Sequence, residues 1–214
     1  MSTMAELTTT SYAILGLLSL RPHSAYDLTQ QARRSLAFIW PISESQLYAE
    51  PRRLVGEGLV KATKEPAGPT RTRTVYRITA KGRRAFAGWL HTAPAAPGLG
   101  SEILLRVAFA DAGDKEALLG SIAACREAVT ARYEAGRRQV KEQLAGTAPY
   151  PERASLNAVW WVLIGEQLRL TLDWLAWAEA EVRAWEGTQP HAFDDRLRAL
   201  AERLVAGEAI LRGP

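Results

Sequence analysis

Five cations lie close together in a short stretch that is interrupted by a proline- and glycine-rich turn. They are Lys61, Lys64, Arg71, Arg73 and Arg77, with the hydroxyls of Thr70 and Thr72 among them. Arginine and lysine bind phosphate oxygens, and like charges this close together need a polyanion or solvent to screen them. The pattern favours phosphate binding, and a solvated strand edge protected by charge is the alternative.

The segment just before these cations has the spacing of a helix with one apolar face. That face consists of Leu47, Pro51, Leu54 and Gly58, with Val55 beside them. The opposite face consists of Ser45, Ala49, Arg52 and Gly56, flanked by Gln46, Tyr48 and Arg53. Such a small, polar and cationic surface can approach base edges and phosphates, although an ordinary surface helix would also fit. Because proline lacks the backbone N–H, we expect a kink at Pro51 or a helix that reads DNA with its first turns.

Histidine and cysteine are too few and too scattered for metal or nucleophilic chemistry. The chain has His23, His91, His191 and a single cysteine, Cys125, which excludes an internal disulfide. Cys125 falls on an apolar helix stripe, where a buried inert thiol is more common than a nucleophile. No H-E-x-x-H, G-x-S-x-G, Walker or CxxC motif is present. We expect no enzyme, no metal site and no cofactor.

Charge is unevenly divided along the 214 residues. The net charge is +4, but residues 1–98 carry 13 basic and 6 acidic side chains, whereas residues 99–214 carry 14 and 17. This asymmetry suggests that only the first part meets a polyanion. The 47% hydrophobic content indicates a globular protein and excludes collagen-like, disordered and disulfide-scaffold classes.

A membrane span and a secretory signal are both unexpected. Apolar runs such as Ala158–Gly165 are far shorter than the roughly 20 residues that a spanning helix needs. Met1–Thr10 lacks a basic segment before an apolar one. We expect a cytoplasmic protein with no membrane partner.

The elements predicted around the cations are three helices, a hairpin and a fourth helix. The helices are expected over YAILGLLSL with Ser11 as cap, over Ala25–Leu36 with Ser24 as cap, from a Ser43/Gln46 capping box onward, and over Lys81–His91 with Thr79 as cap. The strands are expected over Leu59–Glu65 and Arg73–Thr79, with Thr74, Tyr76 and Ile78 on one face and Arg73, Val75 and Arg77 on the other. This is the outline of a winged helix-turn-helix.

The segment Thr92–Gly100 (TAPAAPGLG) separates this part from an all-helical remainder. We predict a mainly α protein with a small two-stranded antiparallel wing. Its parts are a winged helix-turn-helix DNA-binding domain at 8–91, a linker at 92–100 and an α-helical dimerisation domain at 101–212.

Two long apolar stripes run through the helical remainder. One, in Asp114–Ala145, occupies positions 118, 122, 125, 129, 133, 136, 140 and 144. The other comprises Leu156, Trp160, Leu163, Gln167, Leu170, Trp174, Ala178, Val182 and Trp185, and a last helix spans about Phe193–Leu211. A single winged helix reads few base pairs, so we predict that Asp114–Ala145 and Ser101–Asp111 pack against a second copy. A self-contained hairpin of the two long helices is the alternative.

Tryptophan is concentrated in the second stripe, where five of the seven lie within Trp160–Trp185. Such rings pack helices together or line a pocket for a flat apolar ligand. If a ligand pocket exists, between the domains or at a dimer seam, its candidates are Trp89, Trp160 and Trp161.

Three segments, Tyr12–Leu28, Phe38–Ala62 and Arg71–Leu90, resemble the PadR family of bacterial transcriptional regulators. The shared pieces are ILGLL, Pro-x-Ser-x-Tyr-Asp-Leu, Trp-Pro, Gln-Leu-Tyr, Arg-Arg-Leu-x-x-x-Gly-Leu-Val and Tyr-x-x-Thr-x-x-Gly, in the family's order. The remainder is similar in layout to the longer PadR subgroup, most closely in LLRVAFADAGDKEALL. The chain departs from many members at Ala25, where they have glycine, and at Pro51, where they have leucine.

The resemblance implies a homodimer that binds an inverted-repeat operator in double-stranded DNA, usually as a repressor. It also implies a phenolic or hydrophobic effector that releases the DNA. By position, Tyr26, Gln46 and Tyr48 would face or support DNA, and Arg71 and Arg73 would lie on the wing. Together with the residue patterns, this gives one predicted DNA-binding set: Tyr26, Ser43, Ser45, Gln46, Tyr48, Arg52, Arg53, Lys64, Arg71 and Arg73. The rival function is a winged-helix protein-interaction module without DNA binding.

Overall fold

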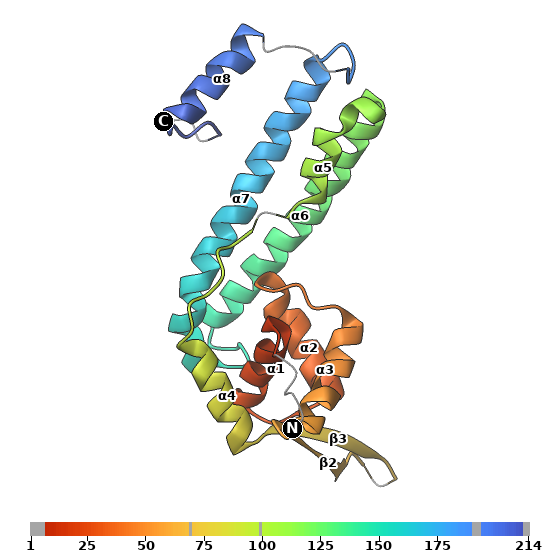
Figure 1. The fold of residues 1–214 in the computed structure, drawn as a ribbon, viewed down its shortest axis with the longest axis vertical. Coiled ribbons are helices and arrows are strands. Elements are labelled where there is room, and N and C mark those ends of the chain that lie inside the picture. The colour runs from red at the N-terminus through yellow and green to blue at the C-terminus, as the bar shows by residue number, and fades with distance from the viewer. Residues whose placement is uncertain (1–6, 69, 99, 190–193, 212–214) are drawn as a thin grey trace, which may run out of the picture. The chain divides into compact units, whose positions relative to one another are not determined.

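The computed structural model describes residues 7–68, 70–98, 100–189 and 194–211, and the chain divides into two compact units, Met1–Pro97 and Gly98–Pro214. The first unit contains α1 (Thr9–Leu20), β1 (His23–Ser24), α2 (Ala25–Arg34), the 3-10 turn η1 (Leu36–Phe38), α3 (Glu44–Gly56), β2 (Val60–Pro66), β3 (Thr72–Ile78) and α4 (Ala80–Leu90) (Figure 1). The second contains α5 (Glu102–Ala108), η2 (Ala110–Ala112), α6 (Lys115–Leu144), η3 (Pro151–Arg153), α7 (Ala154–Ala184) and α8 (Asp195–Val205). The mainly helical winged fold is therefore confirmed.

Reciprocal caps fix where the first three helices begin. Ser24 and Ser43 cap α2 and α3 as predicted, and each exchanges hydrogen bonds with the residue three positions later. At α1 the prediction was wrong by one turn. Thr8 is the cap, and Ser11 is the residue that returns a bond to it. Two hydroxyl residues three positions apart fit either role from sequence alone.

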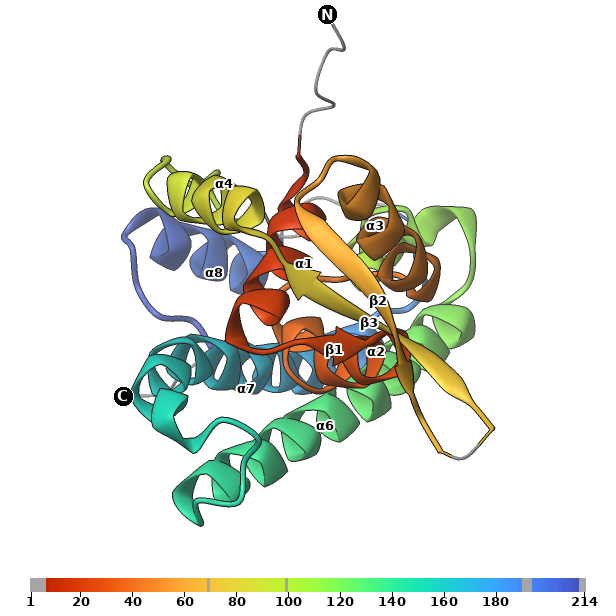
Figure 2. The same ribbon diagram turned by 90° about the horizontal axis from the view of Figure 1, so that it is seen from below.

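The predicted hairpin forms, and β1 adds a third strand that the sequence did not reveal. The strand order is β1-β3-β2, and both pairings are antiparallel. A two-residue strand shows no alternation of apolar and polar residues, so it gives no signal. Val75 and Tyr76 are both buried, although they point to opposite faces of β3 and Val75 shares its face with Arg73 and Arg77. Figure 2 shows β2 and β3 projecting beyond the helices of their unit.

The core of the first unit joins α1 to α3 and the sheet. Its fully buried side chains include Ile14, Leu28, Leu47, Leu54 and Leu59. The apolar face of α3 is thus the predicted one, and the helix continues through the buried Pro51. Burial of that face leaves the opposite face of α3 on the surface.

A glycine explains how the wing joins α4. Thr79 caps α4 by accepting a hydrogen bond from the Gly82 N–H, and its own hydroxyl donates to the carbonyls of Gly58 and Leu59. A Cβ on Gly82 would lie 2.2 Å from the Leu59 carbonyl oxygen, which is backbone and cannot move aside easily. The Tyr-x-x-Thr-x-x-Gly motif therefore fixes the helix against the end of the hairpin.

In the second unit, α6 and α7 run antiparallel and side by side (Figure 1). Their shared core includes Ile122, Leu175, Ala178 and Val182, and α5 adds Ile103. The first part of the stripe predicted on Asp114–Ala145, from Leu118 to Val129, therefore lies against α7 of the same chain, whereas Leu144 at its end is exposed. Whether Asp114–Ala145 and Ser101–Asp111 also pack against a second copy stays a prediction.

The stripe predicted for α7 was wrong in its first half. Leu156, Leu163 and Leu170 are exposed, and Trp161 is buried instead. This half of α7 is apolar on nearly all sides, so periodicity could not choose a face. The last helix begins at the Asp194 cap, and Phe193 lies outside the described residues. No described helix has the length and hydropathy to span a membrane.

Candidate nucleic-acid interface

The predicted outer face of α3 is on the surface. Ser45, Gln46, Ala49 and Arg52 are all exposed, and Tyr48 keeps 41% of its surface accessible. No described residue forms an ion pair or hydrogen bond with the Arg52 side chain. A face of small, hydroxyl, amide and guanidinium groups offers donors and acceptors without steric bulk, as readout in a DNA groove requires.

The first turn of α3 is held by its own side chains. The Ser43 N–H donates to Oε1 of Gln46 over 2.9 Å, and the Gln46 N–H donates to Oγ of Ser43 over 3.3 Å. Oγ of Ser45 lies 3.0 Å from Oγ of Ser43. The carboxamide of Gln46 thus uses its oxygen for the cap and leaves Nε2 able to donate outward. The partial positive charge at a helix N-terminus adds attraction for phosphate.

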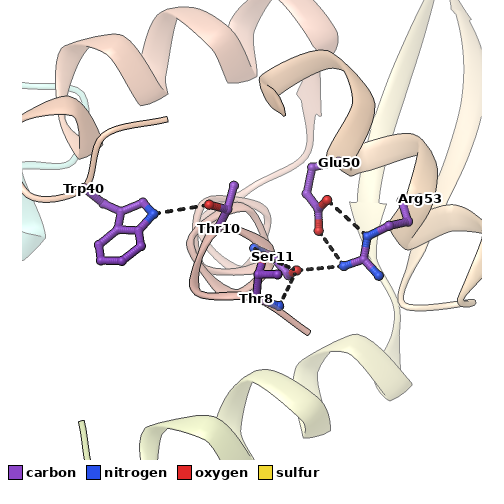
Figure 3. Close-up of polar contacts among 6 residues, drawn as sticks. All are labelled: Thr8, Thr10, Ser11, Trp40, Glu50 and Arg53. Carbon is purple, nitrogen blue, oxygen red and sulfur yellow. Dashed lines mark hydrogen bonds and ion pairs between the residues drawn. The ribbon is translucent and has the colours of Figure 1, made fainter. Parts of the chain in front are cut away.

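Arg53 lies beside this face but is engaged inside the protein (Figure 3). Its guanidinium donates to both carboxylate oxygens of Glu50, over 3.1 and 2.7 Å, and to the hydroxyl of Ser11 over 2.7 Å. Burial acts to raise the pKa of Glu50, but the hydrogen bonds from Arg53 and Ser11 outweigh it and lower the pKa. These contacts attach α3 to the first turn of α1.

Two further contacts orient the segments around α3. Nε1–H of Trp40 donates to the Thr10 hydroxyl over 3.2 Å, which fixes the Trp-Pro segment against α1 (Figure 3). Arg33 of α2 forms a 2.7 Å ion pair with Glu44 of α3. Tyr26, in the first turn of α2, keeps 66% of its surface exposed. The paired helices therefore present Tyr26 and the start of α3 while both are held in place.

The five wing cations are not equivalent. Arg77 forms a 2.7 Å ion pair with Glu65 on the neighbouring strand, and Arg73 lies 3.8 Å from Asp27 of α2. Lys61, Lys64 and Arg71 are exposed and form no ion pair with any described residue. The role of Glu65 was not predicted from the sequence, although the strand register that sets Glu65 opposite Arg73 places a carboxylate near these arginines. Uncompensated charge is therefore concentrated on Lys61, Lys64 and Arg71.

Asp27 links α2 to the wing. Its pKa is lowered by the hydrogen bond from the Ser24 hydroxyl, 2.8 Å long, with a smaller contribution from Arg73. An ionised Asp27 therefore caps α2 and also neutralises part of the charge of Arg73. A phosphate that approaches Arg73 would compete with this carboxylate.

His23, on β1, is 2% exposed and lies opposite Tyr76 of β3 in the antiparallel register. Burial lowers its pKa, and the nearby charge of Arg21 lowers it further. The imidazole is thus held neutral inside the winged unit at neutral pH. No described group of three or more His, Cys, Asp or Glu side chains could hold a metal.

The three candidate ligand-binding tryptophans do not form one cluster. Trp89 lies in the first unit and stacks on Tyr12 with the ring centroids 4.8 Å apart. Trp160 and Trp161 lie in the second unit with their ring centroids 4.2 Å apart. Trp161 lines a cavity between α6 and α7.

The profile of the family described as "Transcriptional regulator PadR-like family" matches residues 14–88. A Bacillus subtilis (strain 168) protein named "Negative transcriptional regulator PadR" is 33% identical over 79 residues, which cover 37% of this chain and 43% of that protein. A Mycobacterium tuberculosis protein named "Probable transcriptional regulator Rv1176c" is 29% identical over 125 residues, which cover 54% of this chain and 66% of that protein. The chain thus spans between two fifths and two thirds of these relatives.

Solved structures share the fold across most of the chain. Bacillus subtilis PadR in complex with operator DNA is 21% identical, covers 83% of this chain and 99% of its own, and has a TM-score of 0.69. The same protein in complex with p-coumaric acid is 22% identical, covers 82% and 99%, and has a TM-score of 0.59. The likeness continues past residue 88 into the long helices.

Proposed function

Because this chain belongs, through residues 14–88, to the PadR-like family of transcriptional regulators, we propose that it binds operator DNA as a cytoplasmic homodimer and represses transcription. The family is one of regulators, not enzymes. The observation that carries the proposal is the exposed outer face of α3, in the same compact unit as a wing with three uncompensated cations.

The side chains divide by the part of the duplex that they suit. Ser45, Gln46, Tyr48 and Arg52 project from α3 and are assigned to base edges, where hydrogen-bond donors and acceptors give specificity. Phosphate contacts are assigned to Tyr26, Ser43, Lys64, Arg71 and Arg73. Arg53 is assigned a supporting role, since Glu50 and Ser11 already occupy its guanidinium.

Salt-dependent binding to duplex DNA tests this assignment. Each phosphate contact releases counterions, so the affinity should fall steeply with salt. The Arg71→Ala/Arg73→Ala variant should bind all sequences more weakly and lower the slope of log K against log salt by about 1–2. Arg77→Ala is the matched control, because Glu65 already pairs with that arginine. Equal affinity of wild type and the double variant would favour the protein-interaction module instead.

The dimer is supported by an exposed apolar stripe on α7, on the side opposite α6. Val159, Leu163, Leu156 and Val162 keep 76%, 59%, 57% and 69% of their surfaces exposed. A contiguous apolar surface of this kind marks an interface. We assign it to a second copy of the chain, since a two-fold operator requires two winged units.

Helix α8 offers a further apolar surface for the same dimer. It has no buried residue, and Leu197, Leu200 and Leu204 lie on one of its faces. Its first turn is attached to α7 through the ion pair of Arg196 with the buried Glu181. The rest of the helix is available to pack on the partner.

Light scattering coupled to size exclusion measures this association. Wild type should elute as a dimer at micromolar concentration, and Val159→Glu/Leu163→Glu should elute as a monomer. Leu90→Glu, with 62% exposure on the last residue of α4 in the first unit, controls for added charge and should stay dimeric. A wild-type species of 23.5 kDa at micromolar concentration would contradict the homodimer.

The effector part of the proposal is drawn from the Bacillus subtilis relative, whose structure was solved with p-coumaric acid. We propose that a small aromatic or hydrophobic molecule likewise releases this chain from DNA. The tryptophans of the helical unit suit such a ligand. Loss of duplex binding on addition of an aromatic compound would support this part, and unchanged binding across a broad panel would contradict it.

A further inference from the structure

Three arginines on the surface of the winged unit each lie against a carboxylate. The pairs are Arg33 with Glu44, Arg73 with Asp27 and Arg77 with Glu65. Each of these arginine side chains is about half exposed. An exposed arginine attracts the phosphates of a duplex whatever its sequence. The carboxylates therefore bear on the part of DNA binding that does not depend on sequence.

Asp27 differs from the other two carboxylates because the cap of its own helix holds it in place. Its Oδ2 accepts a hydrogen bond from the Ser24 hydroxyl over 2.8 Å and a longer one from the Ser24 N–H over 3.4 Å. In return, the Asp27 N–H donates to Oγ of Ser24 over 3.1 Å. These reciprocal bonds make Asp27 a negative charge at a fixed position, whereas Arg73 reaches it from a long side chain.

The three-stranded sheet brings this fixed carboxylate to the wing. β1 sets Ser24 opposite Val75 of β3, and Arg73 follows two positions away on the same face of β3 as Val75. From Val75 toward Thr72, β3 pairs with β2 alone among the described strands. Asp27 lies in the first turn of α2, directly after β1. Its carboxylate therefore meets β3 just past the point where the pairing with β1 ends.

The contact between Asp27 and Arg73 is one that a phosphate can replace. Oδ2 of Asp27 and Nη1 of Arg73 are 3.8 Å apart, which is too long for a hydrogen bond. Attraction between two exposed charges at this distance is weak in water. Arg73 can thus turn to a DNA phosphate while Asp27 keeps its bonds to Ser24, so the exchange leaves the cap of α2 intact.

We propose that Asp27 competes with DNA phosphate for Arg73 and thereby lowers the affinity of this protein for duplex DNA of any sequence. The inference rests on the proposed function, in which Arg73 contacts the DNA backbone. Non-specific DNA competes with an operator throughout a genome, so a regulator benefits from a carboxylate that restrains sequence-independent binding. Asp27 is in this sense a residue that determines specificity without reading a base.

Fluorescence anisotropy with a mixed-sequence duplex at low salt tests the competition. Asp27→Asn removes the charge but keeps an oxygen that accepts from Ser24, so the affinity should rise about two- to fivefold. In the Arg73→Ala background the same substitution should give no such gain, because the arginine that it releases is absent. Glu44→Gln is the matched control, since its carboxylate pairs with Arg33, and its effect should not depend on Arg73.

A second comparison does not require Asp27→Asn to fold. Arg71 and Arg73 are both on the wing, but only Arg73 has a carboxylate partner among the described residues. Arg73→Ala should therefore weaken binding to the mixed-sequence duplex less than Arg71→Ala does. Circular dichroism of each variant measures whether the fold is kept.

Three results would overturn the proposal. One is no gain from folded Asp27→Asn, and another is an equal gain with and without Arg73, which would make Asp27 a source of general repulsion. The third is an equal loss from Arg71→Ala and Arg73→Ala. Each of these results, obtained with a wild type that binds duplex DNA, contradicts this inference alone. A folded wild type that binds no duplex at low salt contradicts the proposed function and this inference with it.

Discussion

The guanidinium of Arg53, on α3, donates a hydrogen bond to the hydroxyl of Ser11, on α1, over 2.7 Å. Ser11 is fully buried and also belongs to the cap of α1. The contact therefore joins the start of α1 to the last turn of α3. The angle at which α3 meets DNA depends on this connection if the proposed function holds.

Arg53→Ala should lower the free energy of unfolding by about 1–3 kcal/mol. The substitution leaves the half-buried Glu50 and the buried Ser11 without their donor, and unsatisfied polar groups of this kind destabilise a fold. Urea denaturation followed by circular dichroism measures the change. A double-mutant cycle with Glu50→Gln should show coupling between the two positions, and strictly additive effects would remove Arg53 from its supporting role.

Arg52→Ala should behave in the opposite way. Arg52 is exposed and has no partner among the described residues, so its loss should change the free energy of unfolding by less than about 0.5 kcal/mol. It should weaken specific duplex binding by about 1–3 kcal/mol and relax sequence preference. Fluorescence anisotropy with specific and scrambled duplexes checks both effects, and unchanged preference would exclude Arg52 from base readout.

Gln46→Glu should affect stability and DNA binding differently. Glutamate at this position keeps the capping box and adds favourable charge near the helix N-terminus, so stability should be unchanged or higher by about 0.3–1 kcal/mol. The same negative charge removes the Nε2 donor and repels phosphate, so duplex affinity should fall at least about tenfold. Thermal denaturation and anisotropy on one preparation give both values. Retained affinity would place Gln46 outside the interface.

Gly82→Ala tests the junction between the wing and α4. The added Cβ would clash with the Leu59 carbonyl oxygen, so we expect a loss of about 2 kcal/mol or more in unfolding free energy. Gly88→Ala, on the same helix with open space around a built Cβ, should instead stabilise by up to about 1 kcal/mol. Equal effects of the two substitutions would contradict the close approach.

The lowered pKa of His23 predicts how the free energy of unfolding depends on pH. Because its pKa in the fold lies below the ordinary value of 6.5, the unfolded chain binds the proton first as the pH falls. The contribution of a neutral His23 is therefore complete above about pH 6.5 and is lost as the pH drops toward the lowered pKa. Unfolding midpoints at pH 7.5, 6.5 and 5.5 should show this slope in wild type and in His91→Gln but not in His23→Gln. An identical slope in all three would exclude His23 as its source.

Local sequence patterns predicted much of the fold. Hydroxyl residues ahead of apolar runs marked the starts of α2, α3 and α4 because a capping bond needs only residues three positions apart. The same signal did not identify the cap of α1, because Thr8 and Ser11 are both hydroxyl residues and lie three positions apart. No signal indicated β1, because a two-residue strand is too short to show alternation of apolar and polar residues. The outer face of α3 followed directly from the burial of Leu47 and Leu54.

Local sequence patterns could not predict the long-range contacts. Nothing local connects Arg53 with Ser11, so the sequence placed Arg53 among groups for DNA rather than groups for support. The pairing of Arg77 with Glu65 depends on strand register, and the buried face of α7 depends on which side meets α6. Both contacts depend on tertiary packing, which local sequence patterns do not determine.

Selection of bound duplexes from a random pool tests the central claim most directly, because it asks whether the exposed face of α3 reads sequence at all. We predict enrichment of an inverted repeat whose half-sites are about one helical turn apart, with enrichment reduced for Arg52→Ala. A pool that stays random after repeated rounds, with folded protein at low salt, would contradict it.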